Sequence, residues 1–339
     1  MPMQTQPITK HRIGYIDALR GFTMILVVCW HVVYFSKVKI FGILEFFALF
    51  RMPLFFFICG FILYKKDFIW NISNSIKFLS KKFLVQIIPT VIFLSIFMFI
   101  FSLNTFTDRL NGYWFTITLF EYFIVYSLSN LLIKNNIIRT IILFAIAIFL
   151  YSTTYGSWLD INYPLTYKYI LYNFQFFIFF LIGTIAKQYF EKICKYIFAN
   201  NLIMMFVIAF LFIGSILYIN KYFVEIGVKL ALSIFGIFSI FYFFMKNGEY
   251  IDNSRIGKTL QFIGRRTLDI YLLHYFFTND SLAWIKNIGI ESPIITFTIA
   301  IATSFIIIGF CLLISKFLRT NPLLGKILFG AKLPTNEKG

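Results

Sequence analysis

The sequence predicts an all-α, polytopic integral membrane protein with about ten transmembrane helices and both termini in the cytoplasm. The 339-residue chain is 60% hydrophobic, has only 13% charged residues and has a mean hydropathy of +0.82. Soluble domains carry about 25% charged residues, so this chain has too little polar surface to cover itself in water. Its apolar residues also form stretches of about 20, the length of a helix that crosses a bilayer. The lipid bilayer is therefore its expected solvent.

Ten apolar stretches bounded by charged or turn residues are the predicted spans, and they form one membrane domain over residues 1–339. The leader before the first stretch is polar and that stretch begins with charges, so we expect a retained helix rather than a cleaved signal peptide. The connecting segments are too short for a separate soluble domain. The predicted spans are residues 16–35, 43–64, 83–103, 113–133, 137–153, 169–186, 202–219, 228–245, 268–285 and 294–318.

The distribution of basic residues predicts the orientation. Of the 31 Lys and Arg residues, 22 fall on the same side as the N-terminus and 7 on the opposite side. Cytoplasmic loops carry the excess of positive charge, so both termini are expected in the cytoplasm. Topology also explains most of the net charge of +17, and we expect no nucleic-acid partner. The composition, rich in Phe, Ile, Asn and Lys, suggests a bacterial inner (cytoplasmic) membrane.

The first span carries ionisable residues along one face. Asp17 and Arg20 are three residues apart and can form an ion pair near the cytoplasmic surface. Arg20 and His31 are eleven residues apart, close to three turns, so His31 lies on the same face about 16 Å deeper. An imidazole has an ordinary pKa of about 6.5, which suits a general base near pH 7. Ionisable residues in a bilayer are costly, so this stripe favours a site for a long anionic donor over a histidine that is merely hydrogen-bonded.

The second and fourth spans contain a buried arginine and a buried acid. Pro53 removes a backbone donor and is expected to kink the second span, freeing a carbonyl group near Arg51. Arg51 needs a counter-charge, and Glu121 lies at a similar predicted depth. Such a pair would act either as a clamp between helices or in catalysis, and the sequence leaves both open. Trp114 suits an interfacial aromatic belt or a surface on which a sugar stacks.

The ninth span again combines charge with a histidine. Arg265 and Asp269 are four residues apart, a spacing at which side chains on one helix are neighbours. His274 lies further into the membrane, at a depth comparable to that of His31. Two of the three histidines are therefore expected inside the membrane, although their spacing does not tell whether they meet.

Four motifs, spread from the first to the ninth span, together resemble one protein family. They are Asp17-x-x-Arg20-Gly21 with His31, the stretch Met52–Phe61, Tyr113-Trp114-Phe115 and the stretch Ile263–His274. This combination resembles the acyltransferase family 3 of integral-membrane O-acyltransferases. The resemblance implies a ten-helix enzyme that transfers an acyl group, usually acetyl from acetyl-CoA, to a hydroxyl group of a cell-surface polysaccharide or a lipid-linked glycan precursor.

The resemblance also implies roles for individual residues. Arg20 and His31 match the family residues associated with donor binding and catalysis, and Lys81 and Lys82 would help Arg20 hold the phosphates of CoA. His31 would take the proton from the acceptor hydroxyl or would itself be acylated, and both routes stay open. Further candidates are His274 and Glu121 for catalysis, Arg51 for donor binding and Trp114 for acceptor binding.

The chain departs from the family pattern at three places. Cys59 stands where the family commonly has Ser, and Arg51 stands where it commonly has His. The basic motif before the third span is represented by Lys81 and Lys82, with Val85-Gln86 where a further base is expected. Lysine neutralises phosphate as a point charge but lacks the bidentate fork of arginine.

Other classes of function fit less well. A multi-pass carrier or flippase for a glycan or lipid is the alternative, but no internal repeat is evident and the Arg20–His31 stripe has no clear purpose there. A purely structural membrane protein would not explain the cost of its buried ionisable groups. The four cysteines form no C-x-x-C pair, and with only three histidines we expect no metal site.

Overall fold

The computed structural model describes residues 13–36, 43–103, 112–155, 172–221, 225–278, 282, 285 and 292–330, and their regular structure is helical without strands. The helices before the middle of the chain are α1 (Gly14–Phe35), α2 (Ile43–Ala48), α3 (Arg51–Leu63), α4 (Ile72–Lys82), η1 (Phe83–Ile87), α5 (Ile88–Ile100), α6 (Trp114–Leu132) and α7 (Asn136–Tyr155). The helices of the second half are α9 (Phe177–Gln188), α10 (Phe190–Ile193), η4 (Cys194–Phe198), α11 (Asn201–Ile219), α12 (Ile226–Lys246), α13 (Gly248–Asn253), α14 (Arg255–Arg265), α15 (Thr267–Leu273), η5 (His274–Phe276), α17 (Pro293–Leu318) and α18 (Pro322–Phe329).

The described residues contain 8 helices that are long and apolar enough to cross a membrane. This confirms the prediction of an all-α protein with several membrane helices. The number ten and the cytoplasmic placement of the termini stay predictions, and the leader 1–12 and the outer bases Lys37, Lys39, Arg109, Lys168 and Lys286 lie outside the described residues.

Two predicted spans are not among these eight helices. The stretch 169–186 is represented by α9, which has 12 residues, and residues 169–171 lie outside the described part. The stretch 268–285 begins as α15 but leaves the α-helix after Leu273, where a 3₁₀ turn begins. Beyond residue 278, most of this stretch also lies outside the described part. Uniform hydropathy did not reveal this break, because hydropathy is insensitive to local backbone geometry.

The second span is interrupted as its proline predicts. The chain leaves the helix at Leu49 and Phe50, between α2 and α3. Pro53 has no N–H to donate to the carbonyl group four residues earlier, which belongs to Leu49. That carbonyl oxygen instead accepts a hydrogen bond from Ser233 of α12 at 2.7 Å. The freed backbone group therefore ties the break to a neighbouring helix.

The third span begins earlier than predicted and contains a π-helical turn. Helical structure runs from Ile72 to Ile100, with Asn71 capping its start by accepting from the Asn74 N–H at 2.8 Å. The π-helical segment η1 ends at Ile87, two residues before Pro89. Pro89 has no N–H to donate to the carbonyl group four residues earlier. This missing hydrogen bond explains why the helix changes from the α to the π pattern here.

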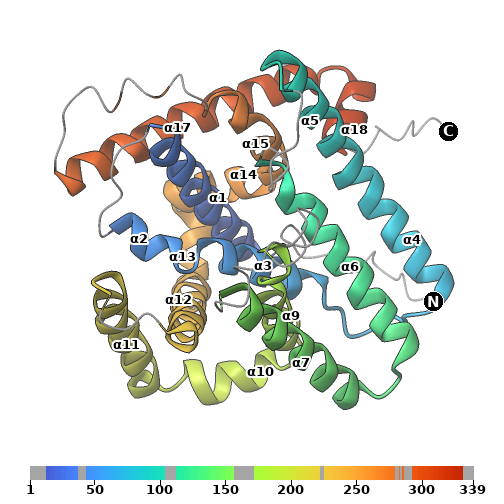
Figure 1. The fold of residues 1–339 in the computed structure, drawn as a ribbon, viewed down its shortest axis with the longest axis vertical. Helices are drawn as coiled ribbons and strands as arrows, with labels where there is room; N and C mark the ends of the chain where they lie inside the picture. Colours follow the sequence, from blue (N-terminus) through green and yellow to red (C-terminus); the bar gives the residue numbers. More distant parts are fainter. Residues whose placement is uncertain are drawn as a thin grey trace, which may run out of the picture.

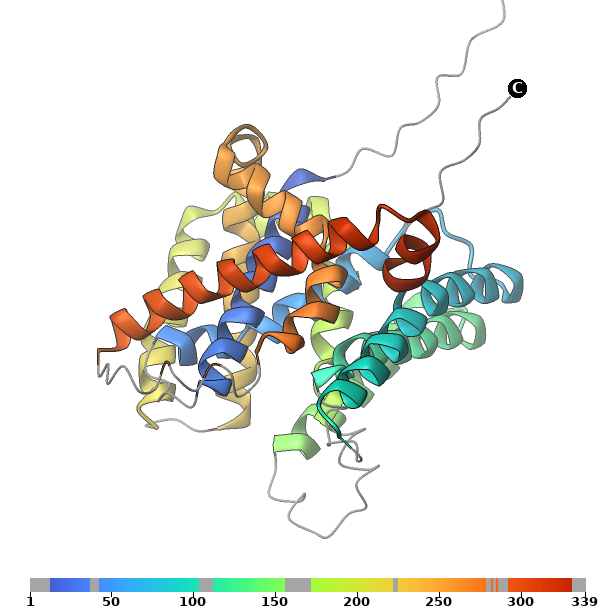
Figure 2. The ribbon, with the colours of Figure 1, turned by 90° about the horizontal axis from the view of Figure 1, so that it is seen from above.

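Helix α1 lies at the centre of the molecule, where it packs against α14, α17, α3 and α12 (Figure 1). Its crossing with α14 is close because both helices carry a glycine at the contact: a Cβ on Gly21 would collide with the Leu260 carbonyl, and one on Gly264 with the Asp17 carbonyl. Gly60 and Gly183 play the same part between α3 and α9. Figure 2 shows α17 running obliquely across α1 and α15.

Candidate active site

Two membrane histidines from distant parts of the chain meet at the contact of α1 with α15. The Nδ1 atom of His31 lies 3.0 Å from the Nε2 atom of His274, and the ring centroids are 5.1 Å apart. His274 is fully buried, whereas His31 is half-buried. The sequence predicted that both residues lie at similar depth but not that they touch.

The backbone determines which nitrogen of His274 carries a proton. Its Nδ1 atom lies 3.0 Å from the carbonyl oxygen of Ile270 and 2.8 Å from that of Tyr271. Carbonyl oxygens only accept, so Nδ1 is the donor and, in the neutral ring, Nε2 is the acceptor. His31 then donates to it through Nδ1. The lone pair of a neutral His31 is then on its Nε2 atom.

A tyrosine hydroxyl occupies that lone pair in the structure. The Oη atom of Tyr275 lies 3.0 Å from the Nε2 atom of His31. With both imidazoles neutral, the hydroxyl donates to Nε2, and a directional chain runs from Tyr275 through His31 and His274 to the backbone. A base whose second nitrogen is held by an orienting partner is the arrangement used to activate hydroxyl groups.

The 3₁₀ turn η5 brings His274 and Tyr275, two consecutive residues, against the same imidazole. The segment is held in place from α6, because the Tyr113 hydroxyl donates to the Leu272 carbonyl at 2.8 Å. Gly112 packs against the ring of Tyr275 with a φ of +97°, and a Cβ there would collide with that ring. Glycine suits both the left-handed backbone and the close approach.

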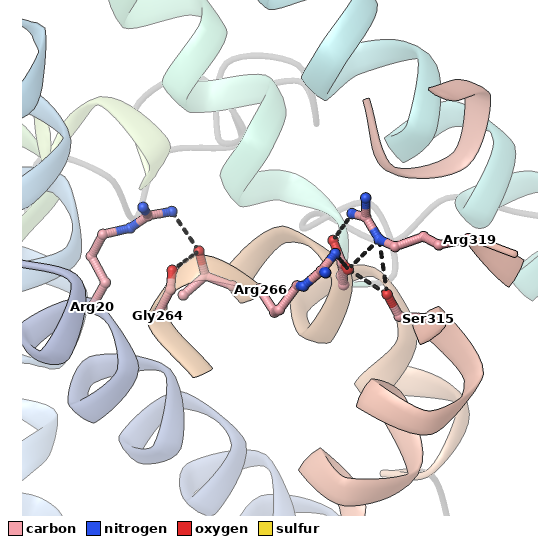
Figure 3. Close-up of polar contacts among 7 residues, drawn as sticks. Arg20, Gly264, Arg266, Ser315 and Arg319 are labelled. Atoms are coloured by element: carbon pink, nitrogen blue, oxygen red, sulfur yellow. Dashed lines mark hydrogen bonds and ion pairs between the residues drawn. The ribbon is translucent and has the colours of Figure 1, made fainter. Parts of the chain in front are cut away.

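Arg20 lies at the other end of the predicted stripe. Its Nη1 atom is 3.6 Å from Asp17, which confirms the ion pair expected from their spacing. Its Nη2 atom donates to the Thr267 hydroxyl at 2.7 Å, linking α1 to the start of α15. Figure 3 shows Arg20 approaching the start of α15 beside Gly264, with Arg266 and Arg319 beyond it.

Arg265 does not pair with Asp269, because the helix breaks at Arg266 and the four-residue spacing does not continue across the break. Asp269 is 2% exposed and instead pairs with Arg319, whose Nη2 and Nε atoms lie 2.8 and 3.0 Å from its two oxygens. Ser315 also donates to this carboxylate, and Arg266 lies 3.5 Å from it. The carboxylate therefore fixes α17 to α15 (Figure 3).

The two lysines of the predicted donor site differ in position. Lys81 is exposed, whereas Lys82 is half-buried, with its ammonium group 4.7 Å from the centre of the Phe123 ring. Lys82 and Arg20 are close enough for their charges to interact with each other and with Cys59. The structure thus brings Lys82 to the Arg20 end of the stripe.

Arg51 and Glu121 do not form the ion pair that the sequence suggested as possible. The guanidinium of Arg51 lies 3.8 Å from the centre of the Trp30 ring, a cation–π contact with α1. The buried Oε2 atom of Glu121 has no hydrogen-bond partner among the described residues. Roles of Arg51 in donor binding and of Glu121 in catalysis stay predictions.

Trp114 is 6% exposed and lies in an aromatic cluster with Phe56 and Phe176, whose ring centroids are 6.1 and 5.7 Å from its own. Its ring is covered by these neighbours, as expected of a packing residue at the start of α6. Binding of an acceptor by Trp114 stays a prediction.

The two ends of the stripe on α1 are partly exposed, and the helix between them is buried. The side chain of Arg20 is 27% exposed at one end. At the other end Trp30 and His31 are half-buried and Tyr34 is exposed. Every residue from Thr23 to Cys29 is buried. Two molecules could therefore approach the stripe from opposite ends.

Sequence reasoning missed several contributors to the site. Tyr275 directly follows His274, and Thr267 lies within the same motif, so adjacency was the available signal for both. Ser315 and Arg319 lie one turn apart at the end of the last predicted span, and only the fold shows that they meet Asp269. In the described part of the chain, no three His, Cys, Asp or Glu side chains come together as a metal site.

A family model described as an acyltransferase domain matches residues 13–316, nearly the whole chain. This match confirms the resemblance drawn from the four motifs. No curated protein and no solved structure matches the chain.

Proposed function

The chain belongs to this acyltransferase domain family and is a membrane acyltransferase, and from that premise we propose that it is an O-acetyltransferase. Its donor would be acetyl-CoA, and its acceptor a hydroxyl group of a cell-surface polysaccharide or of a lipid-linked glycan precursor. The observation that carries the proposal is the hydrogen-bonded chain from Tyr275 through His31 to His274.

The Nε2 atom of His31 is the proposed general base. Tyr275 shows that this nitrogen can accept from a hydroxyl group, and the acceptor hydroxyl would take the same place. His31 takes the proton as the acceptor oxygen attacks the thioester carbonyl, and the tetrahedral intermediate then breaks its C–S bond. The CoA thiolate leaves and is protonated by the His31 imidazolium, which returns the base to its neutral form. His274 orients the imidazole and accepts from its Nδ1–H throughout.

Arg20 and Lys82 support a donor site at the other end of the stripe. Their positive charges are near enough to interact, and the Arg20 side chain is partly exposed. Phosphate groups of CoA would bind there by charge-assisted hydrogen bonds. The thioester would then extend toward His31, about 16 Å along α1. The acceptor would approach from the opposite end, beside Trp30 and Tyr34.

A second route uses the same residues. His31 itself would attack the thioester, form an acetyl-imidazole with release of CoA, and pass the acetyl group to the acceptor. The two routes differ in one observable, because only the second places label on the protein before an acceptor is added.

The test is transfer of label from radiolabelled acetyl-CoA in membranes that express the wild type or His31→Ala, with glycan and protein fractions counted separately. We expect glycan label in the wild type and a loss of at least about 100-fold in the variant, the usual contribution of a general base. His11→Ala is the matched control and should retain activity. Full transfer by His31→Ala at equal membrane abundance would refute the mechanism.

The alternative function, a carrier or flippase, is separated by a simpler assay. Purified protein with acetyl-CoA and an acceptor preparation should release the CoA thiol, whereas a carrier releases none.

A further inference from the structure

A line of polar side chains runs along η1 and α5 from the donor end of the site. Lys82, Gln86 and Thr90 succeed one another at intervals of four residues. Lys82 lies over Phe123 of α6, and the Thr90 hydroxyl lies 2.8 Å from the hydroxyl of Thr116, also on α6. Gln86 lies between them in the π-helical turn. Such polar residues in a membrane helix commonly face a functional interior.

This line continues to the histidine pair. Thr116 follows Phe115, whose N–H donates to the Tyr271 hydroxyl at 3.1 Å, and that hydroxyl donates to the Gly112 carbonyl at 3.1 Å. Tyr271 lies one turn before His274 and its carbonyl group accepts from the His274 ring. Polar groups therefore connect the Lys82 end of the site to the imidazoles. We refer to Gln86, Thr90 and Thr116 as the polar track.

Gln86 is the member of the polar track that needs a partner. Its Oε1 atom is buried and has no hydrogen-bond partner among the described residues. A buried amide oxygen without a donor is costly, so native structures nearly always provide one. An acceptor of this kind is satisfied by an N–H or O–H group, and not by a phosphate, which would be repelled by it.

The spacing of the polar track fits one part of an acyl-CoA molecule. Lys82 and Thr90 are eight residues apart along the helix, about 12 Å. The pantetheine arm of CoA extends from the phosphates to the sulfur and carries amide N–H groups between them. On the proposed function, the phosphates bind at Arg20 and Lys82 and the sulfur lies near His31. The arm would then run past Gln86, which lies midway between Lys82 and Thr90 in the sequence.

We propose that the polar track binds the amide-bearing arm of the acyl donor, with the Gln86 Oε1 atom accepting a hydrogen bond from an amide N–H of that arm. This inference rests on the proposed function and adds the subsite that holds the donor between its phosphates and its thioester. It assigns Gln86, which stands where a further base was expected, to recognition of a neutral amide.

The test measures binding of three compounds to the purified full chain by calorimetry: CoA, pantetheine, and adenosine 3′,5′-bisphosphate. Gln86→Leu should weaken binding of CoA and pantetheine about five- to tenfold, the effect of one lost hydrogen bond. Binding of the bisphosphate should not change. Arg20→Ala should show the reverse pattern, with CoA and the bisphosphate weakened and pantetheine unaffected.

Gln175→Leu is the matched control, because the Oε1 atom of Gln175 is likewise buried and has no described partner. It lies on a different segment, just before α9, and should bind all three compounds as the wild type does. If Gln86→Leu does not fold, Gln86→Met has a similar shape without the amide and provides the same test.

Two outcomes would overturn this inference in different ways. In the first, a folded Gln86 variant binds CoA and pantetheine as the wild type does, while the wild type transfers acetyl. This result would refute binding of the donor arm by the polar track and would leave the proposed function standing. A wild type that neither binds CoA nor transfers acetyl would refute both.

Discussion

The Nδ1 atom of His31 and the Nε2 atom of His274 lie 3.0 Å apart although 243 residues separate them in the chain. The proton of His31 is thereby assigned to the nitrogen that faces His274, and the nitrogen that can act as a base is directed toward Tyr275. This relationship makes the contribution of each residue separately testable.

His274→Ala should lower kcat about 10- to 100-fold while the KM for acetyl-CoA changes little, because the base would lose the partner that orients it. The measurement is steady-state acetyl transfer at varied donor concentration. Thr278→Val is a suitable control, since Thr278 donates to the backbone carbonyl of His274 at 3.2 Å and leaves its ring untouched. Equal loss of activity in both variants would show that the segment, rather than the imidazole, matters.

Tyr275→Phe should raise the release of CoA thiol in the absence of acceptor, by about threefold or more. The phenol hydroxyl occupies the Nε2 atom of His31, and without it water would gain access to the base. Thiol release without acceptor measures this directly. Tyr113→Phe loosens the same segment without uncovering the Nε2 atom of His31, so it should not raise thiol release without acceptor. A fall in acetyl transfer without any rise in hydrolysis would instead place the hydroxyl in the transition state.

Arg319→Ala should destabilise the protein by about 3 kcal/mol or more, because it leaves the buried Asp269 carboxylate without its bidentate partner. Thermal unfolding in detergent provides the measurement. Arg266→Ala should have a smaller effect, since its contact with Asp269 is longer, at 3.5 Å, and its side chain is 37% exposed. The structural account of this carboxylate fails if the two variants unfold at the same temperature.

Gly264→Ala should lower both stability and acetyl transfer. The added methyl group would collide with the Asp17 carbonyl and force α14 away from α1. Thr267 and His274 come directly afterwards in α15 and η5, so their contacts with Arg20 and His31 would lengthen. Gly309→Ala is the control, because a Cβ at Gly309 meets nothing within 4 Å. If Gly264→Ala transfers acetyl at the wild-type rate, the site does not depend on the close contact of α1 with α14.

Apolar length predicted most of the helices well. Helices α1, α6, α7, α11, α12 and α17 begin and end within two residues of the expected stretches. Apolar length did not predict where a helix ends inside an apolar stretch, as after Leu273. Pro53 was the exception, because a missing N–H is visible in the sequence and its consequence at Leu49 follows from helix geometry.

The site was predictable only along one helix at a time. The register of Arg20 and His31 follows from the period of α1, and the Asp17–Arg20 pair follows from the same rule. The meeting of His31 with His274 depends on how closely α1 and α14 cross. That distance is set by the contact of Gly21 with Gly264, and two glycines far apart in a sequence do not reveal that they face each other.

The buried middle of α1, from Thr23 to Cys29, has a consequence for the energetics of the cell. Donor and acceptor would reach the reaction centre from opposite ends of this helix, whose middle is covered by neighbouring helices. An acetyl group, handed over by bond exchange, could change sides without a water-filled passage. The protein would then perform vectorial chemistry while the membrane kept its ion gradients.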